Sequence, residues 1–338
     1  DPRKRLEKDA PAYKPKYVTI LPGMNDGTYQ PFQQEIFETY RRDMTTLLDQ
    51  IQGIGALPIP MTPTMFDARA DRAKEKNTRE VAVERGYGYV DMWGPLNTIT
   101  LEQRKTDPAF TLIKDAVHPG PDGQLVMAAA IINDLGLPRK VSGIVLTVQG
   151  GERPPTARAT GGKVTDLHST DDGLSFTFTA ASLPWVVPEE ARNGFKLARA
   201  GHRLGQESIE VHGLPPGRYA LTIDGVEVGR YSAEQLGRHV ELQENESTPQ
   251  FQQALAVAML NKQRNEGPIA KLRDEWRQFQ QYARTRRTAQ EQPDNERVQK
   301  DLADLEGRIT GMEERVNAAN AAAMALEDQI FQQNRPQP

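Results

Sequence analysis

Residues 16–27 read Lys-Tyr-Val-Thr-Ile-Leu-Pro-Gly-Met-Asn-Asp-Gly, and this stretch decides the fold. Its first half is a short, β-rich apolar run of the kind that forms a buried parallel strand. Its second half, residues 23–27, is a polar loop flanked by glycines. Loops at the carboxyl ends of strands line the ligand crevice of an open parallel sheet, so we expect this loop to face one.

The elements around this stretch alternate between helix and strand as far as residue 137. Apolar residues at helical spacing mark the helices, and glycines and prolines separate the elements. The predicted elements are a helix over 32–52, a strand over 56–62, a helix over 69–86, a strand over 86–93 and a helix over 121–135. This alternation predicts an α/β core, residues 1–137, with a parallel sheet between helices.

The character of the sequence changes twice after residue 137. Residues 138–247 carry short alternating runs divided by Gly, Pro and Asp, which predict a small antiparallel β module, with Asp224-Gly225 as a hairpin turn. Residues 248–335 predict a helical hairpin, because a heptad series of apolar residues over 298–330 needs a partner helix. The helix before it in sequence, over 251–284 and with an expected interruption at Gly267-Pro268, is one candidate partner. Self-association through the same 298–330 seam is the alternative.

Composition excludes several classes of site and partner. The chain has 42 basic and 46 acidic residues, so it carries no strong charge of either sign and nucleic acid is not an expected partner. The lack of cysteine excludes disulfides, thiolate catalysis and cysteine-bound zinc. No apolar run approaches the roughly 18 residues of a membrane span. There is no signal-like start, so the compartment stays open, with export to the periplasm as one option.

Two short motifs carry candidate chemistry. In the first, the Asn25 side chain can donate its amide N–H to an oxyanion, and the flanking glycines let the backbone turn and let substrate approach. In the second, Asp115-Ala-Val-His118 precedes the 121–135 helix, and a carboxylate three residues from an imidazole can orient it. Each motif also has a plain alternative, namely turn chemistry for the first and surface residues beside a helix start for the second.

The two motifs in this order resemble those of the SGNH, or GDSL-like, hydrolases. Residues 18–26 are similar to that family's third conserved block and residues 115–118 to its fifth, and the lead-in over 6–16 also looks alike. The resemblance covers about residues 3–137. The remainder looks like the C-terminal extension of some bacterial members, most clearly over residues 213–225. The resemblance implies a flavodoxin-like sheet of the SGNH type.

The resemblance also implies roles for five residues. His118 would be the general base that activates a serine, and Asp115 would orient His118. Asn25 would donate a hydrogen bond to the tetrahedral oxyanion, Gly23 would shape that loop and Asp26 would brace it. The implied reaction is hydrolysis of small acyl esters, with carbohydrate O-acetyl groups as one substrate class. No metal or organic cofactor is implied.

The sequence departs from the family at the nucleophile. The first block, Gly-Asp-Ser, is absent, and the first serine of the chain is Ser142. We therefore expect the α/β core to be N-terminally incomplete by about one βαβ unit, and residues 1–338 to be inactive alone. The alternative is a non-catalytic protein on a degenerate hydrolase core, either an interaction platform or a module that binds carbohydrate through residues 139–245.

Overall fold

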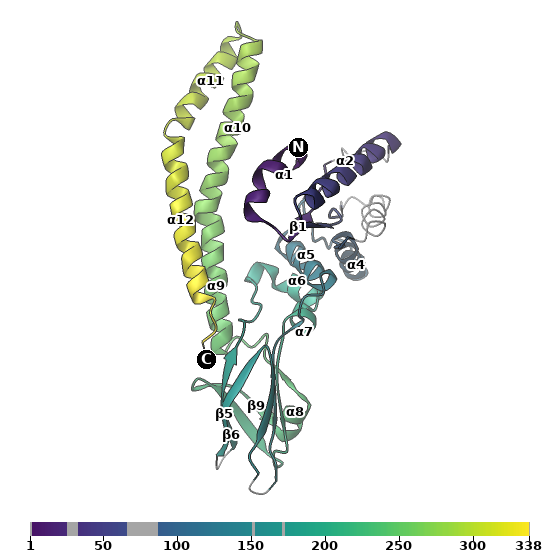
Figure 1. Ribbon diagram of the computed structural model, residues 1–338, viewed down its shortest axis with the longest axis vertical. Coiled ribbons are helices and arrows are strands. Elements are labelled where there is room, and N and C mark those ends of the chain that lie inside the picture. Colours follow the sequence, from purple (N-terminus) through teal and green to yellow (C-terminus); the bar gives the residue numbers. More distant parts are fainter. Residues whose placement is uncertain (1, 26–32, 66–86, 151–152, 171–172, 338) are drawn as a thin grey trace. The chain divides into compact units, whose positions relative to one another are not determined.

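The structure is a computed structural model, which describes residues 2–25, 33–65, 87–150, 153–170 and 173–337. The chain divides into two compact units. Unit 1 comprises Asp1–Val141 and Glu189–Gln206, and unit 2 comprises Ser142–Pro188 and Glu207–Pro338. The helix predicted over 69–86 lies outside the described residues. Figure 1 labels the elements of both units.

A parallel sheet organises unit 1. Strand β1 (Tyr17–Ile20) pairs in parallel with β2 (Leu57–Pro60), and Met61 forms a parallel bridge with Val90. The strands predicted over 16–22 and 56–62 are therefore confirmed. The strand predicted over 86–93 is reduced to that one bridge. The β1 strand is also less buried than expected, since Tyr17 is 64% exposed.

Helices surround this sheet. Those predicted over 32–52 and 121–135 are confirmed as α2 and α5, and Leu48 and Ile51 of α2 are completely buried. The helices of unit 1 are α1 (Pro2–Asp9), α2 (Gln34–Gly53), α4 (Trp93–Gln103), α5 (Pro121–Asp134), α6 (Arg192–Leu197) and α7 (Ala200–Leu204), with 3-10 turns at Pro11–Tyr13 and Glu189–Ala191.

The sequence did not predict α4, whose first N–H groups are bonded by one residue distant along the chain, Thr62, and one local residue, Asp91. The hydroxyl oxygen of the buried residue Thr62 accepts hydrogen bonds from the backbone N–H groups of Met92 at 2.6 Å and Trp93 at 3.0 Å. These N–H groups begin the helix and have no partner within it. Thr62 lies two residues past β2, so the local pattern could not reveal its contacts, whereas the Asp91 Oδ1, which accepts from the Gly94 N–H at 2.8 Å, is a local signal that the sequence analysis did not use.

Residues 189–206 belong to unit 1, although the sequence placed them in the β module. The Asp122 carboxylate at the start of α5 accepts a hydrogen bond from the Gly194 N–H at 2.7 Å. A Cβ at residue 194 would lie 2.4 Å from the Asp122 carbonyl oxygen. The backbones of α5 and α6 are therefore in close contact at a position where only glycine fits. The chain thus leaves the β strands, packs helices on α5 and then returns.

Unit 2 contains a mixed sheet and two hairpins. The sheet has the strand order β10-β7-β3-β4, and the hairpins are β5-β6 and β8-β9. The bounds are β3 (Lys140–Thr147), β4 (Thr156–Thr160), β5 (Gly162–Thr170), β6 (Gly173–Ala180), β7 (Gln206–His212), β8 (Arg218–Ile223), β9 (Val226–Ser232) and β10 (Val240–Glu241), with a short helix α8 (Ala233–Arg238).

The prediction of a purely antiparallel module is wrong at one strand pair. The N–H of Gln206 bonds to the carbonyl of Arg139, and the N–H of Val148 bonds to the carbonyl of His212. Both strands therefore run in the same direction, so β3 and β7 are parallel. Parallel neighbours need a long connection, which here includes the helices of 189–206. The predicted Asp224-Gly225 turn is confirmed, with φ of 49° and 81° as a type I′ hairpin requires.

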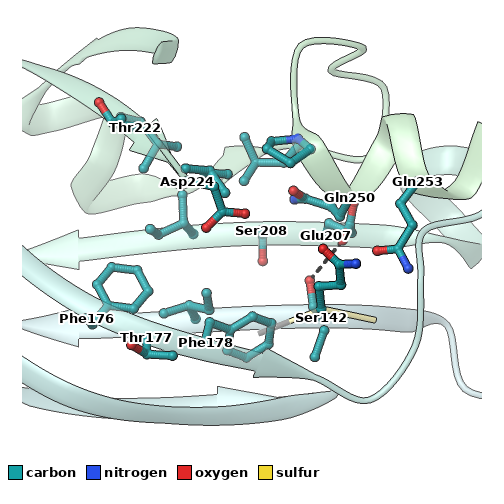
Figure 2. A pocket seen from close by; sticks show the side chains of 18 of the residues that line it. Ser142, Phe176, Thr177, Phe178, Glu207, Ser208, Thr222, Asp224, Gln250 and Gln253 are labelled. Carbon is teal, nitrogen blue, oxygen red and sulfur yellow. Dashed lines mark hydrogen bonds between the residues drawn. The ribbon is translucent and has the colours of Figure 1, made fainter. Parts of the chain in front are cut away.

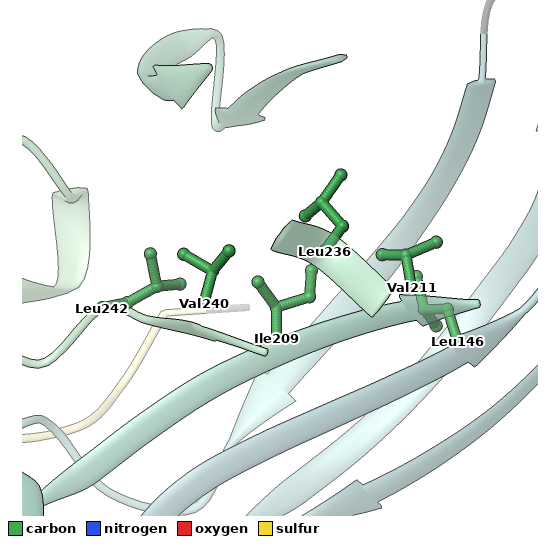
Figure 3. Close-up of a cluster of buried hydrophobic side chains, with 6 residues drawn as sticks. All are labelled: Leu146, Ile209, Val211, Leu236, Val240 and Leu242. Atoms are coloured by element: carbon green, nitrogen blue, oxygen red, sulfur yellow. The ribbon is translucent and has the colours of Figure 1, made fainter. Parts of the chain in front are cut away.

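One apolar cluster forms the centre of the β module. It joins β3, β7, α8 and β10, and every member is at most 7% exposed (Figure 3). Its members are Leu146, Ile209, Val211, Leu236, Val240 and Leu242. Inward-facing residues from both hairpins, among them Phe176 and Leu221, pack against it. The alternating pattern of the sequence is therefore used to build a layered β core.

The C-terminal helices form a hairpin within unit 2 (Figure 1). Its first arm is α9 (Pro249–Arg264), a π turn (Asn265–Ile269) and α10 (Ala270–Glu291), and its second arm is α11 (Glu296–Ile309) and α12 (Met312–Gln333). The second arm packs on the first, with α11 against α10 and α12 against α9. Among the described residues, no helix has the length and hydropathy to cross a membrane.

Two details of this hairpin correct the sequence analysis. Gly267-Pro268 does not interrupt the first arm, because the π turn absorbs the proline. The predicted continuous helix over 298–330 is instead broken at Thr310 and Gly311, where Gly311 takes a left-handed φ of 71°. The guanidinium of Arg315 donates to the Thr310 and Arg308 carbonyls and pairs with Glu275 of α10, which secures the break.

Candidate active site

Asp115 and His118 form a compact hydrogen-bonded turn before α5. The Asp115 Oδ1 accepts from the backbone N–H groups of Val117 at 3.0 Å and His118 at 2.7 Å. The other oxygen, Oδ2, lies 2.7 Å from the His118 Nδ1. The structure thus brings together the two residues that the sequence paired.

The ionised Asp115 carboxylate determines which nitrogen of the neutral His118 ring carries the proton. The hydrogen bond from the His118 backbone N–H, with further bonds from the His118 ring and the Val117 N–H, lowers the pKa of Asp115 to about 2. Asp115 is therefore ionised at neutral pH and can only accept hydrogen bonds. Nδ1 must then carry the proton, which leaves the lone pair of a neutral ring on Nε2. The His118 side chain is 81% exposed, so Nε2 is open to a reacting group.

The core anchors the backbone that carries this turn. Leu112 and Ile113 are 3% and 1% exposed, and their carbonyls accept hydrogen bonds from the N–H groups of Gly120 and Ala116. Ala116 adopts a left-handed φ of 68°, a strained conformation for a residue with a Cβ. Strained backbone held by a rigid surround is common at functional sites.

The loop after β1 is built on a second special backbone position. Gly23 has a φ of 121°, and a Cβ there would lie 3.2 Å from Pro63 and 3.3 Å from the Tyr40 hydroxyl. Only glycine fits this conformation and this space. Asn25 follows as an exposed residue of the turn, while Asp26 lies outside the described residues.

Contacts of α5 place both loops at the same edge of the sheet. Ala130 belongs to the same buried cluster as Ile59 of β2, whereas Val126, one turn earlier, belongs to a cluster with Met65, beyond the carboxyl end of β2. The helix therefore runs opposite to the strands, and its N-terminus, which follows His118, lies at their carboxyl edge. Asn25 is at that edge too, because it follows the last residue of β1 by five positions.

Other candidate chemistry is sparse in unit 1. No group of three or more His, Asp or Glu side chains that could hold a metal ion occurs among the described residues. Residues 1–141 contain no serine. The sequence analysis overlooked one buried acidic residue in unit 2, Glu207, which is 5% exposed. Its only sequence signal was an acidic position beside the apolar alternation of β7.

Comparison with known proteins finds similarity to ester hydrolases over the N-terminal part of the chain. Residues 1–126 match the model of the GDSL-like lipase/acylhydrolase family. An acetylxylan esterase from Geobacillus stearothermophilus is 26% identical over 149 residues. That match covers 40% of this chain and 66% of the esterase, so it leaves about a third of that enzyme unmatched.

Solved structures resemble the chain to different extents. A gut microbial diltiazem-metabolizing enzyme is 24% identical with a TM-score of 0.72, over 99% of this chain and 85% of the other, which is a likeness of fold. A catalytic mutant of an acetylxylan esterase from Geobacillus stearothermophilus reaches a TM-score of 0.32 at 23% identity, over 40% of this chain and 66% of the other. Residues 1–126 are therefore similar to the GDSL-like lipase/acylhydrolase family, the SGNH hydrolases, and the family match does not extend to the rest of the chain.

Proposed function

We propose that unit 1 carries the general base and an oxyanion donor of a serine ester hydrolase that acts on small acyl esters. The observation that carries the proposal is the pair of hydrogen bonds between the Asp115 carboxylate and His118. One carboxylate holds both the backbone and Nδ1 of His118, and Nε2 remains exposed. This is the arrangement that general-base catalysis by a histidine needs.

In the proposed reaction, each group has one role. The Nε2 of His118 takes the proton of a serine hydroxyl as its oxygen attacks the ester carbonyl. The Asp115 carboxylate stabilises the imidazolium that forms, and the Asn25 amide donates to the oxyanion. Collapse of the intermediate breaks the ester C–O bond, and His118 returns the proton to the departing alcohol. Water then releases the acyl group by the same sequence of steps.

The substrate class follows from the family and from the relative. GDSL-like acylhydrolases are ester hydrolases, and the matching relative from Geobacillus stearothermophilus is an acetylxylan esterase. Both support an acyl ester as substrate, and the relative supports a small acyl group, namely acetyl on carbohydrate.

The nucleophile is the part that residues 1–141 do not supply. In this proposal a serine in sequence N-terminal to residue 1 attacks, as the family's first block does. The chain 1–338 by itself is then inactive towards esters.

The test compares 1–338 with a protein extended by the coding sequence upstream of residue 1. Both are assayed with 4-nitrophenyl acetate and with acetylated xylo-oligosaccharides, and a fluorophosphonate probe reports a reactive serine. We expect turnover and labelling in the extended protein only. In the extended protein, His118→Ala should lower kcat by about 10³-fold or more, and Asp115→Asn by a smaller factor.

Lys114→Gln is the matched control, because it lies beside Asp115 and changes a charge without touching the turn. Its kcat should stay within about twofold of the parent. Serine-dependent turnover by 1–338 alone would refute the proposed source of the nucleophile. An extended protein whose activity survives His118→Ala would refute the proposed base.

A further inference from the structure

Unit 2 encloses a cavity that the proposed ester hydrolysis does not use. Its volume is about 670 Å³, within the range of small-molecule sites. The walls come from β3, β6, β7 and β8, and the first turn of α9 closes one side (Figure 2). All of these elements belong to one compact unit, so the cavity is a property of that unit alone.

Glu207 is the most unusual group in this cavity. It is 5% exposed, its Oε1 accepts a hydrogen bond from the Ser142 hydroxyl at 3.3 Å, and its Oε2 has no partner among the described residues. Its backbone N–H donates to the Gln243 side chain at 3.2 Å, which holds the residue in place. Burial raises the pKa of Glu207 to about 7. Buried polar atoms nearly always have partners, so an unpartnered carboxylate oxygen on a residue that lines a cavity indicates a ligand that bonds to it.

The charge of the lining limits which ligands can enter. The described residues that line the cavity include the carboxyl groups of Glu207 and Asp224 but no Lys, Arg or His. Phosphates, sulfates and acidic sugars would be repelled. The remaining polar groups are neutral hydroxyls and amides, among them those of Ser142, Ser208 and Gln250 (Figure 2). These groups can each donate and accept, which suits a ligand with several hydroxyl groups.

Two aromatic rings supply an apolar surface in the same cavity as these polar groups. Phe176 and Phe178 alternate along β6, so they lie on the same face of the strand, and both line the cavity. A Cβ at Gly162 of β5 would lie 2.4 Å from the ring of Phe178, so this ring rests on bare backbone. The ring of Phe178 is thereby restricted in position.

We propose that this cavity binds a neutral saccharide, with Glu207 and Ser142 bonding its hydroxyl groups and Phe178 contacting its C–H face. Sugars present both an apolar C–H face and a ring of hydroxyl groups, and the cavity presents a partner for each. The assignment stands apart from the proposed ester hydrolysis, because every residue named here lies in unit 2. A small organic amine is the competing ligand, since two carboxyl groups also attract a cation.

The experiment is calorimetric titration of the full chain 1–338, which requires no catalytic activity. The probes are xylose, xylobiose, glucose, cellobiose and N-acetylglucosamine, with glucuronate as the anionic and benzylamine as the cationic comparison. We expect at least one neutral saccharide to bind with a Kd of about 1 mM or tighter, and glucuronate not to bind.

Variants assign the binding to the cavity. Phe178→Leu removes the aromatic ring but leaves an apolar side chain, and Glu207→Met removes the carboxylate but leaves a side chain of similar size. Each should weaken saccharide binding about tenfold or more. Glu210→Gln is the matched control on the same strand β7, where the Glu210 side chain pairs with His212 outside the cavity lining. Thermal unfolding of each variant shows whether it is folded, and Phe178→Leu serves alone if Glu207→Met does not fold.

Three outcomes would overturn the proposal. The first is the absence of heat with every neutral saccharide up to 10 mM, a limit of about −2.7 kcal/mol of binding free energy at 25 °C. The second is tighter binding of benzylamine than of any saccharide. The third is saccharide binding that both Phe178→Leu and Glu207→Met leave unchanged, which would place the ligand elsewhere on the chain.

Discussion

The His118 Nδ1 lies 2.7 Å from the Asp115 Oδ2, and the backbone N–H of His118 lies 2.7 Å from the Oδ1 of the same carboxylate. One side chain therefore fixes the ring and the backbone of the histidine together. This local fixation means that the imidazole keeps its orientation even though it is largely exposed.

Asp115→Asn should change the tautomer of His118. In the native turn the carboxylate only accepts, so the Nδ1–H form of the neutral imidazole is stabilised. An amide can either donate or accept, and the preference should weaken. The ¹⁵N chemical shifts of the ring measure the two tautomers directly above pH 8. Asp107→Asn is the matched control, because Asp107 also caps a turn, accepting from the Ala109 N–H, but is not paired with a histidine. An unaltered His118 tautomer in Asp115→Asn would show that the carboxylate does not orient the ring.

The stability of unit 2 should depend on pH through Glu207. Burial raises its pKa from 4.5 to about 7, so the folded state holds the proton more tightly than the unfolded state. The resulting stabilisation is fully present below pH 4.5 and is lost as the pH rises through 7. It corresponds to at most about 3 kcal/mol. Denaturant unfolding at pH 5 and pH 8 measures it, with Glu207→Gln expected to flatten the dependence and Glu210→Gln to preserve it. Parallel pH profiles for native protein and Glu207→Gln would contradict the raised pKa.

Gly123→Ala should disturb the turn that carries His118. The added Cβ would lie 2.9 Å from both the Leu112 carbonyl oxygen and the Pro119 Cβ, which forces α5 and the turn apart. We expect a loss of about 1–3 kcal/mol in unfolding free energy and a shifted His118 amide resonance. Gly120→Ala is the control, since its Cβ would be 3.8 Å from the same carbonyl. Equal effects of the two substitutions would argue against close packing at residue 123.

Two buried threonines of unit 1 should respond oppositely to replacement by valine. Thr62→Val removes the acceptor for the Met92 and Trp93 N–H groups and should cost about 1–3 kcal/mol. The hydroxyl of Thr100 is buried without a partner among the described residues, so Thr100→Val should be neutral or stabilising. Chemical denaturation of the two variants provides the comparison. A stable Thr62→Val protein would show that the hydroxyl is not needed to begin α4.

Much of the fold could be predicted because its signals are local. Helical spacing identified α2 and α5, and an Asp-Gly pair identified the turn between β8 and β9. The predictions failed where distant residues decide the structure. The helix α4 depends on Thr62, some thirty residues earlier, and the parallel pairing of β3 with β7 depends on a connection through both units. The flavodoxin-like arrangement and self-association through 298–330 remain predictions.

The sequence by itself determined the Asp115–His118 pair and its place before α5, because two side chains three residues apart can meet within one turn. It also determined the glycine-bounded loop that carries Asn25. Only the tertiary structure decided that Glu207 is buried in a cavity beside Ser142, from which it is separated by 65 residues. Burial and the loss of hydrogen-bond partners arise when strands from distant parts of the chain pack together. No short stretch of sequence can predict this packing.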